Sequence, residues 1–371
     1  MTTSLIGESF VVAIHLSTSS EEANVSSANA STATRQSPTL NSLSGELKGL
    51  VAAVGGPVVR NKLRLTAKAW GDVANGETRS LKIHDVRGLS TIESNQFPLL
   101  QDIDLSRINL GGNHTDAPAV ARALRENDSQ TAVNLSHNLL GNSPGDLPAI
   151  ADALCENWTL TSANLSYNSL GIYPGDALAI ADILLENCTL TTINWSNNLL
   201  GRNPIDAPVI ADALRQNRSL ISIAWSNNTL GLNPTDLPAI AAGLSENCTL
   251  TSFNLSHNGL GRHSTDAPAI ADALRKNRTL TSIDWSENQF GNSPDDALVI
   301  ANALRENSTL TTLNWSNNLL GRNATDAPAI AHALRDNHTL SWIDLRDNQF
   351  SEDEKCMLAE LAQETSKTIL T

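Results

Sequence analysis

The sequence predicts an α/β solenoid in which strand-and-helix units stack side by side into a horseshoe. Two observations lead to this fold class. A glycine recurs every 30 residues from Gly111 to Gly321, and each interval carries a strand-like half followed by a helix-like half. A period kept this strictly indicates units that bury their apolar faces only against their neighbours. Residues 79–350 are therefore expected to form one elongated array of the 371-residue chain.

The first half of a unit predicts a short strand. Residues 190–201 read L-T-T-I-N-W-S-N-N-L-L-G, in which Ile193 and Trp195 alternate with polar residues, so one face is buried and the other is wet. An asparagine then recurs where the chain leaves each strand, and its amide can bond backbone groups that the turn leaves unpaired. These ladder asparagines are Asn138, Asn168, Asn198, Asn228, Asn258, Asn288, Asn318 and Asn348, whereas the first unit has Ile108 at this position.

The second half of a unit predicts a helix. Each begins with an aspartate, a favoured N-cap residue, and a proline follows two residues later in six of the eight units. An apolar stripe such as Ile210, Ala211 and Leu214 continues the helix. Asn217 ends it, because asparagine tolerates the left-handed conformation at a helix C-terminus. The expected capping aspartates are Asp116, Asp146, Asp176, Asp206, Asp236, Asp266, Asp296 and Asp326.

The motif L-x-x-I-x-W-x-x-N-x-L resembles the leucine-rich repeat, and the ribonuclease-inhibitor-like class of that repeat is the most similar. A strand is narrower than a helix, so the stack is expected to curve with parallel strands on the concave face and helices on the convex face. Residues 351–371 predict a C-terminal capping helix, because Ser351 and Glu354 form a capping-box sequence. Residues 1–42 are rich in Ser and Thr and predict a disordered leader.

One position per unit varies on the otherwise uniform polar face of the predicted strands. We expect this row to contact a protein partner, because repeat proteins bind on their concave surfaces, although a merely solvated face explains each single residue equally well. The row consists of Arg107, His137, Tyr167, Asn197, Asn227, His257, Glu287, Asn317 and Asp347. Tryptophans 195, 225, 285 and 315 occupy the position that leucine holds in other units, so they are expected in the core.

Composition excludes several classes of function. The net charge of −14 argues against nucleic acid as a partner, and no apolar stretch approaches the roughly 20 residues that span a bilayer. The four cysteines show no metal-ligand or redox spacing, so we expect free thiols in a reducing, cytoplasmic compartment, with no metal and no cofactor. No nucleophile–base set or phosphate-binding loop is evident, so the chain is not expected to be an enzyme.

Residues 43–78 predict two or three short helices broken at Gly-Gly-Pro. The order L-x-x-E-L, a central proline, L-x-L and K-x-W resembles the F-box. This resemblance implies apolar contacts with a Skp1-type adaptor through Leu43, Leu47, Val51, Pro57, Leu63, Leu65 and Trp70. Ser44 departs from the F-box pattern, which usually has proline there. The alternative is that the segment only caps the solenoid.

An F-box beside leucine-rich repeats resembles the substrate-recognition subunits of Skp1–cullin–F-box ubiquitin ligases, which hold a target without catalysing its modification. The leader and the alanine-rich helices also resemble GALA-type effectors, which implies secretion by a bacterium into the host cytoplasm. A binding or inhibitor scaffold without a ubiquitin connection is the alternative. The target, the source and the oligomeric state stay open.

Overall fold

The computed structural model describes residues 15–17, 80–82 and 101–371, which form one open twelve-stranded sheet and the helices that cover it. The strands follow chain order in the sheet. From β2 onward they run parallel, whereas β1 pairs with β2 antiparallel. Their bounds are β1 (His15–Ser17), β2 (Ser80–Lys82), β3 (Asp102–Asp104), β4 (Ala132–Asn134), β5 (Ser162–Asn164), β6 (Thr192–Asn194), β7 (Ser222–Ala224), β8 (Ser252–Asn254), β9 (Ser282–Asp284), β10 (Thr312–Asn314), β11 (Trp342–Asp344) and β12 (Thr368–Leu370).

From the pair β3–β4 to the pair β10–β11, neighbouring strands pair at a constant offset of 30 residues, as Ile193 with Ile223 shows. The middle residue of each of these strands is buried in the core. The repeat period and the parallel sheet confirm the predicted α/β leucine-rich-repeat solenoid.

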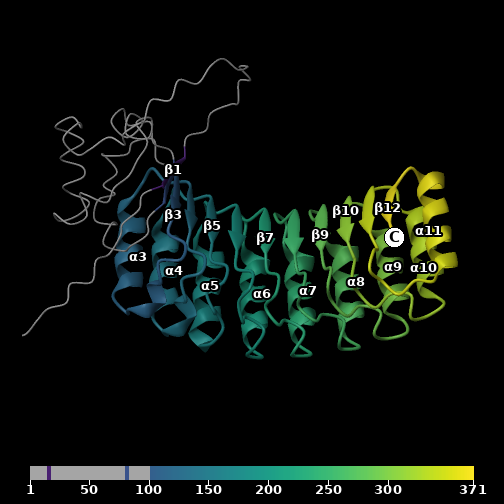
Figure 1. Ribbon diagram of the computed structural model, residues 1–371, viewed down its shortest axis with the longest axis horizontal. Coiled ribbons are helices and arrows are strands. Elements are labelled where there is room, and N and C mark those ends of the chain that lie inside the picture. The colour runs from purple at the N-terminus through teal and green to yellow at the C-terminus, as the bar shows by residue number, and fades with distance from the viewer. Residues whose placement is uncertain (1–14, 18–79, 83–100) are drawn as a thin grey trace, which may run out of the picture.

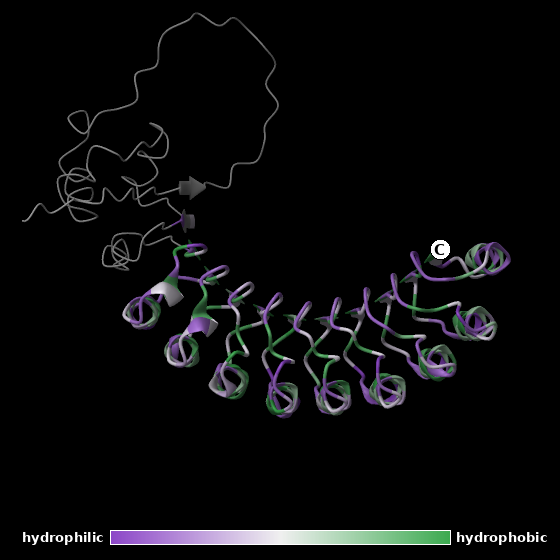
Figure 2. Ribbon diagram, turned by 60° about the horizontal axis from the view of Figure 1, so that its bottom comes forward, coloured by the Kyte–Doolittle hydropathy of each residue, from purple (hydrophilic) through white to green (hydrophobic). Residues whose placement is uncertain are grey.

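Helices alternate with the strands along residues 101–371. Their bounds are α3 (Asp116–Glu126), α4 (Asp146–Glu156), α5 (Pro174–Glu186), α6 (Asp206–Gln216), α7 (Asp236–Glu246), α8 (Asp266–Lys276), α9 (Asp296–Glu306), α10 (Asp326–Asp336) and α11 (Glu352–Thr365), with short 3-10 helices η3 (Leu110–Gly112) and η4 (Leu140–Asn142). Figure 1 shows the helices side by side along the array. In Figure 2 the helices form the outer side of the arc and the strands its inner side, as predicted.

The core fills the space between the strands and the helices. Ile193 from a strand, Leu200 from the turn and Ile210 from a helix are all fully buried, and equivalent residues repeat in every unit. The four predicted core tryptophans are 0% exposed, and Trp195 and Trp225 pack edge to face with ring centroids 5.8 Å apart. The prediction that they belong to the core, and not to a stacking platform, is confirmed.

The helix C-termini differ from the prediction. Asn217 has φ −63° and ψ 138°, an extended conformation and not the left-handed one. The reason is a second asparagine ladder: the Asn217 amide donates to the Leu184 carbonyl of the preceding unit and its Oδ1 accepts from the Leu220 N–H. These side chains are buried, so they satisfy helix-end carbonyls that would otherwise lack partners. The same ladder contains Asn157, Asn187, Asn247, Asn277, Asn307 and Asn337.

The two ends of the sheet also add strands that the sequence did not predict. Residues 15–17 fall in the predicted disordered leader, yet they form β1, because the free edge of β2 offers unpaired backbone groups. At the other end, Ser351 and Glu354 form the predicted capping box at the start of α11. After this helix the chain returns to the sheet as β12, where the predicted cap had only a helix.

Candidate binding surface

The nine variable residues lie in the turn after each strand, three residues beyond the strand's last residue. We call them the turn row: Arg107, His137, Tyr167, Asn197, Asn227, His257, Glu287, Asn317 and Asp347. The prediction that they lie on the strands is wrong, because each strand has only three residues. All nine have a positive φ, from 46° at Asn317 to 61° at Arg107, and all are at least partly exposed.

The ladder asparagines fix the backbone beneath the turn row. Asn168 is 0% exposed, and its amide donates to the carbonyls of Leu135 and Leu165 at 2.9 and 3.0 Å. Its Oδ1 accepts from the Asn138 N–H of the preceding unit at 2.8 Å. The predicted structural role of these asparagines is therefore confirmed. Eight of the nine turn-row residues directly precede a ladder asparagine, so the fold itself fixes their backbone; Arg107 instead precedes Ile108.

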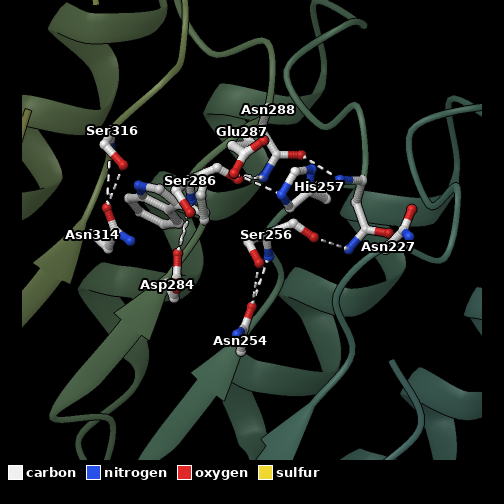
Figure 3. A network of polar contacts seen from close by, with 12 residues as sticks. Asn227, Asn254, Ser256, His257, Asp284, Ser286, Glu287, Asn288, Asn314 and Ser316 are labelled. Atoms are coloured by element: carbon white, nitrogen blue, oxygen red, sulfur yellow. Dashed lines mark hydrogen bonds and ion pairs between the residues drawn. The ribbon is translucent and has the colours of Figure 1, made fainter. Parts of the chain in front are cut away.

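Neighbouring turn-row residues contact each other in pairs across the array. The rings of His137 and Tyr167 are stacked, with centroids 4.2 Å apart and planes at 8°. Further along, the Asn227 amide donates to Asn197 Oδ1 at 2.7 Å. The His257 ring lies 2.6 Å from Glu287 Oε1, and Figure 3 shows this pair bridging two units. The row thus presents an aromatic pair, an amide pair and an imidazole–carboxylate pair in succession.

The outward side chains at the strand ends are held by local hydrogen bonds. In Figure 3, Asn254 Oδ1 accepts from the Ser256 N–H and hydroxyl at 2.9 and 2.8 Å, and Asp284 bonds Ser286 in the same way. We call this set the strand-end row. It consists of Asp104, Asn134, Asn164, Asn194, Ala224, Asn254, Asp284, Asn314 and Asp344.

A third row lies where each unit enters its strand. The hydroxyls of this strand-start row donate to the backbone of the preceding unit, as Thr281 does to the Thr251 carbonyl at 3.1 Å. Its members are Thr131, Thr161, Thr191, Ile221, Thr251, Thr281, Thr311 and Ser341. Together the three rows make a rigid surface of small polar groups, from which the turn-row side chains differ in size and charge.

Charge is distributed unevenly over these rows. Between Arg107 and Arg346 they contain no lysine or arginine, and carboxylates gather towards the C-terminal end at Asp284, Glu287, Asp344 and Asp347. Burial opposes ionisation of Asp344, but the hydrogen bonds from Arg346 hold the pKa of Asp344 below its usual value. The three rows are therefore uncharged over their centre, and exposed carboxylates lie towards the C-terminal end, at Glu287 and Asp347.

The repeated aspartates do not reach this surface. Except in α5, they are the first helical residues and not the predicted N-caps, and none from Asp146 to Asp326 is more than 3% exposed. Asp266 Oδ2 accepts from the Gly261 and His263 N–H groups at 2.9 and 3.3 Å, so it braces the turn, while Oδ1 lacks a hydrogen-bond partner. Burial raises the pKa of Asp206 to about 6 and that of Asp236 to about 7.

All four cysteines are free thiols, as predicted. Burial, together with nearby carboxylates such as Glu186, raises the pKa of Cys155 to about 12. In the part of the chain that the structure describes, His, Cys, Asp and Glu side chains form no metal-binding group, and no described helix is long and apolar enough to cross a membrane. The F-box-like residues Leu43, Leu47, Val51, Pro57, Leu63, Leu65 and Trp70 lie outside the described residues.

Comparison with known proteins gives structural neighbours only. No protein-family model matches the chain, and no curated protein matches its sequence. Leiomodin-1 actin-binding site 2 is similar over 44% of this chain and 90% of its own, with 22% identity and a TM-score of 0.36. The C-terminal domain of Caenorhabditis elegans tropomodulin is similar over 43% and 92%, with 16% identity and a TM-score of 0.35. The TLR13–ssRNA13 complex is similar over 70% and 34%, with 16% identity and a TM-score of 0.45.

Proposed function

We propose that this chain is a non-catalytic scaffold that binds a protein partner along the turn row of its concave face. One observation carries the proposal. The turn row combines an identical backbone in every unit with side chains that differ in size, charge and aromaticity, whereas the rows around it are nearly uniform. Extended concave surfaces of this kind are where repeat proteins bind.

The backbone of the turn row supports a role for its side chains. The left-handed backbone conformation favours glycine, asparagine or aspartate. A bulky side chain in that conformation destabilises the fold by about 1 kcal/mol. Four positions are Asn or Asp, but Arg107, Tyr167 and Glu287 keep bulky side chains with φ between 55° and 61°. Bulky side chains kept in a conformation that favours asparagine support a role for these three residues in binding.

The chemistry of the surface favours protein over nucleic acid. Polyphosphates bind through lysine and arginine, and the rows carry neither between Arg107 and Arg346. Tyrosine is enriched among the residues that dominate protein interfaces, and Tyr167 is 49% exposed while stacked on His137. A protein partner would find an aromatic anchor at this end of the row and carboxylates at the other.

Affinity purification with the full chain, followed by mass spectrometry, identifies the partner. The affinity of that partner for variants of the chain then tests the proposal. Tyr167→Asn and Glu287→Asn suit the left-handed backbone, so they should fold normally and weaken binding at least tenfold together. Asp212→Asn, on the outer face of α6, is the matched control and should bind as the wild type does. The opposite pattern, with loss only in Asp212→Asn, would place the partner on the helices and refute the proposal.

We also propose that the partner is a target delivered to a ubiquitin ligase in the cytoplasm, which for a bacterial effector would be that of the host cell. The F-box-like order of residues 43–78 supports this, and it is independent of the solenoid. The test is a pull-down with a purified Skp1 protein, in which Leu47→Ala with Pro57→Ala should abolish binding. Failure of the wild-type chain to bind Skp1 would leave a scaffold without a ubiquitin connection. In that case, deleting residues 1–75 should not affect partner binding.

A further inference from the structure

The turn that leads from each strand to its helix has two hydrogen-bonding states, which differ at the glycine that recurs every 30 residues. In the first, which we call the forward state, the glycine N–H donates to a backbone carbonyl of the next unit, as Gly231 does to Asn258 at 2.9 Å. In the second, the aspartate state, the glycine N–H donates to the repeated aspartate of its own unit, as Gly261 does to Asp266 at 2.9 Å. The forward state is found at Gly111, Gly141, Gly201 and Gly231, and the aspartate state at Gly171, Gly261, Gly291 and Gly321.

The state of one turn is matched by the backbone of the next unit. After a turn in the forward state, the residue that follows the next ladder asparagine is left-handed, with φ between 60° and 75°, at Leu139, Ser169, Thr229 and Gly259. After a turn in the aspartate state, the equivalent residue has no positive φ, and its N–H donates back to the preceding unit, at Leu199, Gln289, Leu319 and Gln349. The match holds at every turn from Gly111 to Gly321, so the two units change together.

Two peptide links are reversed between the states. At Gly231 the link between Asn258 and Gly259 presents its carbonyl to the preceding unit, whereas at Gly261 the equivalent link presents the N–H of Gln289. The link before the repeated glycine is reversed as well, and in the aspartate state this glycine has φ between 85° and 97°. Because the hydrogen bond joins the two links, one link that turned alone would leave backbone groups of buried residues unpaired.

The charge of the aspartate distinguishes the two states. An ionised carboxylate accepts hydrogen bonds more strongly than a protonated one, so it favours the aspartate state, in which the glycine N–H is an additional donor. In the forward state, Asp236 Oδ2 accepts from the Asn233 N–H and amide, both at 3.3 Å, while Oδ1 has no hydrogen-bond partner among the described residues. A protonated carboxyl group suits this arrangement because it accepts fewer hydrogen bonds.

Two of the turns in the forward state contain an aspartate that ionises near neutral pH. Burial raises the pKa of Asp206 to about 6 and that of Asp236 to about 7. The charged groups near Asp236 are the aspartates of the two neighbouring units, Asp206 and Asp266, and both raise its pKa further. Asp176 of the preceding unit acts on Asp206 in the same direction. Both carboxyl groups therefore change charge between weakly acidic and weakly basic pH.

We infer that the turns at Gly201 and Gly231 are pH-sensitive switches. Each holds the forward state while its aspartate, Asp206 or Asp236, is protonated, and changes to the aspartate state when that carboxyl group ionises. The backbone of the next unit then changes two residues after the turn-row residue, which is His257 for the turn at Gly231. The switch needs no bound partner, so it is independent of the proposed function.

Nuclear magnetic resonance of the full chain labelled with 15N-glycine tests the switch. As pH rises from 5 to 8, we expect the amide proton of Gly231 to move downfield, because it then donates to a carboxylate. Asp236→Asn should abolish this shift and leave the shift of Gly201 in place. The amide proton of Gly261, which donates to Asp266 already, should move less than that of Gly231.

Substitutions at Gly259 separate a switch from simple titration of Asp236. A Cβ at Gly259 has only Gln289 Nε2 within 4 Å, at 3.8 Å, so a side chain fits there. Glutamine disfavours the left-handed φ of 75° that the forward state requires, so Gly259→Gln should lower the midpoint pH of the Gly231 shift by about one unit. Gly259→Asn is the matched control, because asparagine tolerates this conformation, and its midpoint should stay near that of the wild type.

Three results would overturn the inference. Equal midpoints for Gly259→Gln and Gly259→Asn would show that the backbone of the next unit does not follow the turn. A Gly231 resonance that stays constant between pH 5 and pH 8 would show that the turn does not change state. A shift of Gly231 that persists in Asp236→Asn would show that this carboxyl group does not control the turn.

Discussion

The pH dependence of folding should depend on the buried carboxylate of Asp236, and the variant Asp236→Asn tests this. The side chain is 0% exposed, and its Oδ1 has no hydrogen-bond partner. Burial raises the pKa of Asp236 from 3.8 to about 7, and the charges of Asp206 and Asp266 act in the same direction. The hydrogen bonds from Asn233 oppose the shift but do not cancel it.

The direction of the pH dependence is set by whether the folded or the unfolded chain holds the proton on Asp236. Between pH 4 and pH 7 the folded chain keeps the proton on Asp236 while the unfolded chain has released it, so the free energy of unfolding falls as pH rises through this window. A difference of about three pKa units corresponds to roughly 4 kcal/mol, at about 1.4 kcal/mol per unit. Asp236→Asn removes the charge and keeps a carbonyl oxygen for the Asn233 N–H.

Urea unfolding followed by tryptophan fluorescence at pH 5 and pH 8 measures the effect. We expect Asp236→Asn to unfold at higher urea than the wild type at pH 8, by up to about 4 kcal/mol, and to show a smaller change between the two pH values. Asp212→Asn, an exposed carboxylate one unit away, should leave the wild-type pH dependence unchanged. If Asp236→Asn were less stable than the wild type at pH 8 and retained its pH dependence, the electrostatic reasoning would be wrong.

Three further predictions concern a ladder asparagine, a repeat glycine and a buried cysteine. Asn198→Ala removes five hydrogen bonds to backbone groups and should lower the free energy of unfolding by about 3 kcal/mol in urea titrations; a loss below 1 kcal/mol would contradict the ladder's role. A Cβ at Gly201 would stand 2.6 Å from the backbone of the next unit, whereas Gly145 has open space, so thermal denaturation should show a large loss for Gly201→Ala and little change for Gly145→Ala. The raised pKa of Cys155 keeps its thiol protonated at pH 8, so a thiol reagent should modify exposed Cys188 first; the reverse order would argue against burial of Cys155.

The sequence predicts the solenoid well because the same period places the core residues, the turns and the helices. The 30-residue spacing aligns apolar residues for a shared core, and the asparagines at the strand exits bond backbone groups of their own and of neighbouring units. Predictions drawn from the preference of a single residue type, such as aspartate at the helix N-cap, differ from the structure. Aspartate is a good N-cap in isolated helices, but here the turn folds back over Asp266, and its carboxylate bonds the turn in preference to capping.

The sequence shows which position of each unit varies, but not where in the unit that position lies. Variation along the units singles out Tyr167 and its equivalents, yet the alternation of polar and apolar residues cannot show that the strand has already ended there. The left-handed backbone at these positions could have been suspected from Asn197 and Asn227, since asparagine is enriched in that conformation.

Every hydrogen bond of the two asparagine ladders joins residues 28 to 33 positions apart or within one turn, so a unit recognises only its immediate neighbours. Removing or duplicating one whole unit would place equivalent donors and acceptors against each other again. The array can therefore change its length by whole units while every interface between units keeps the same packing. The length of the concave face changes with it.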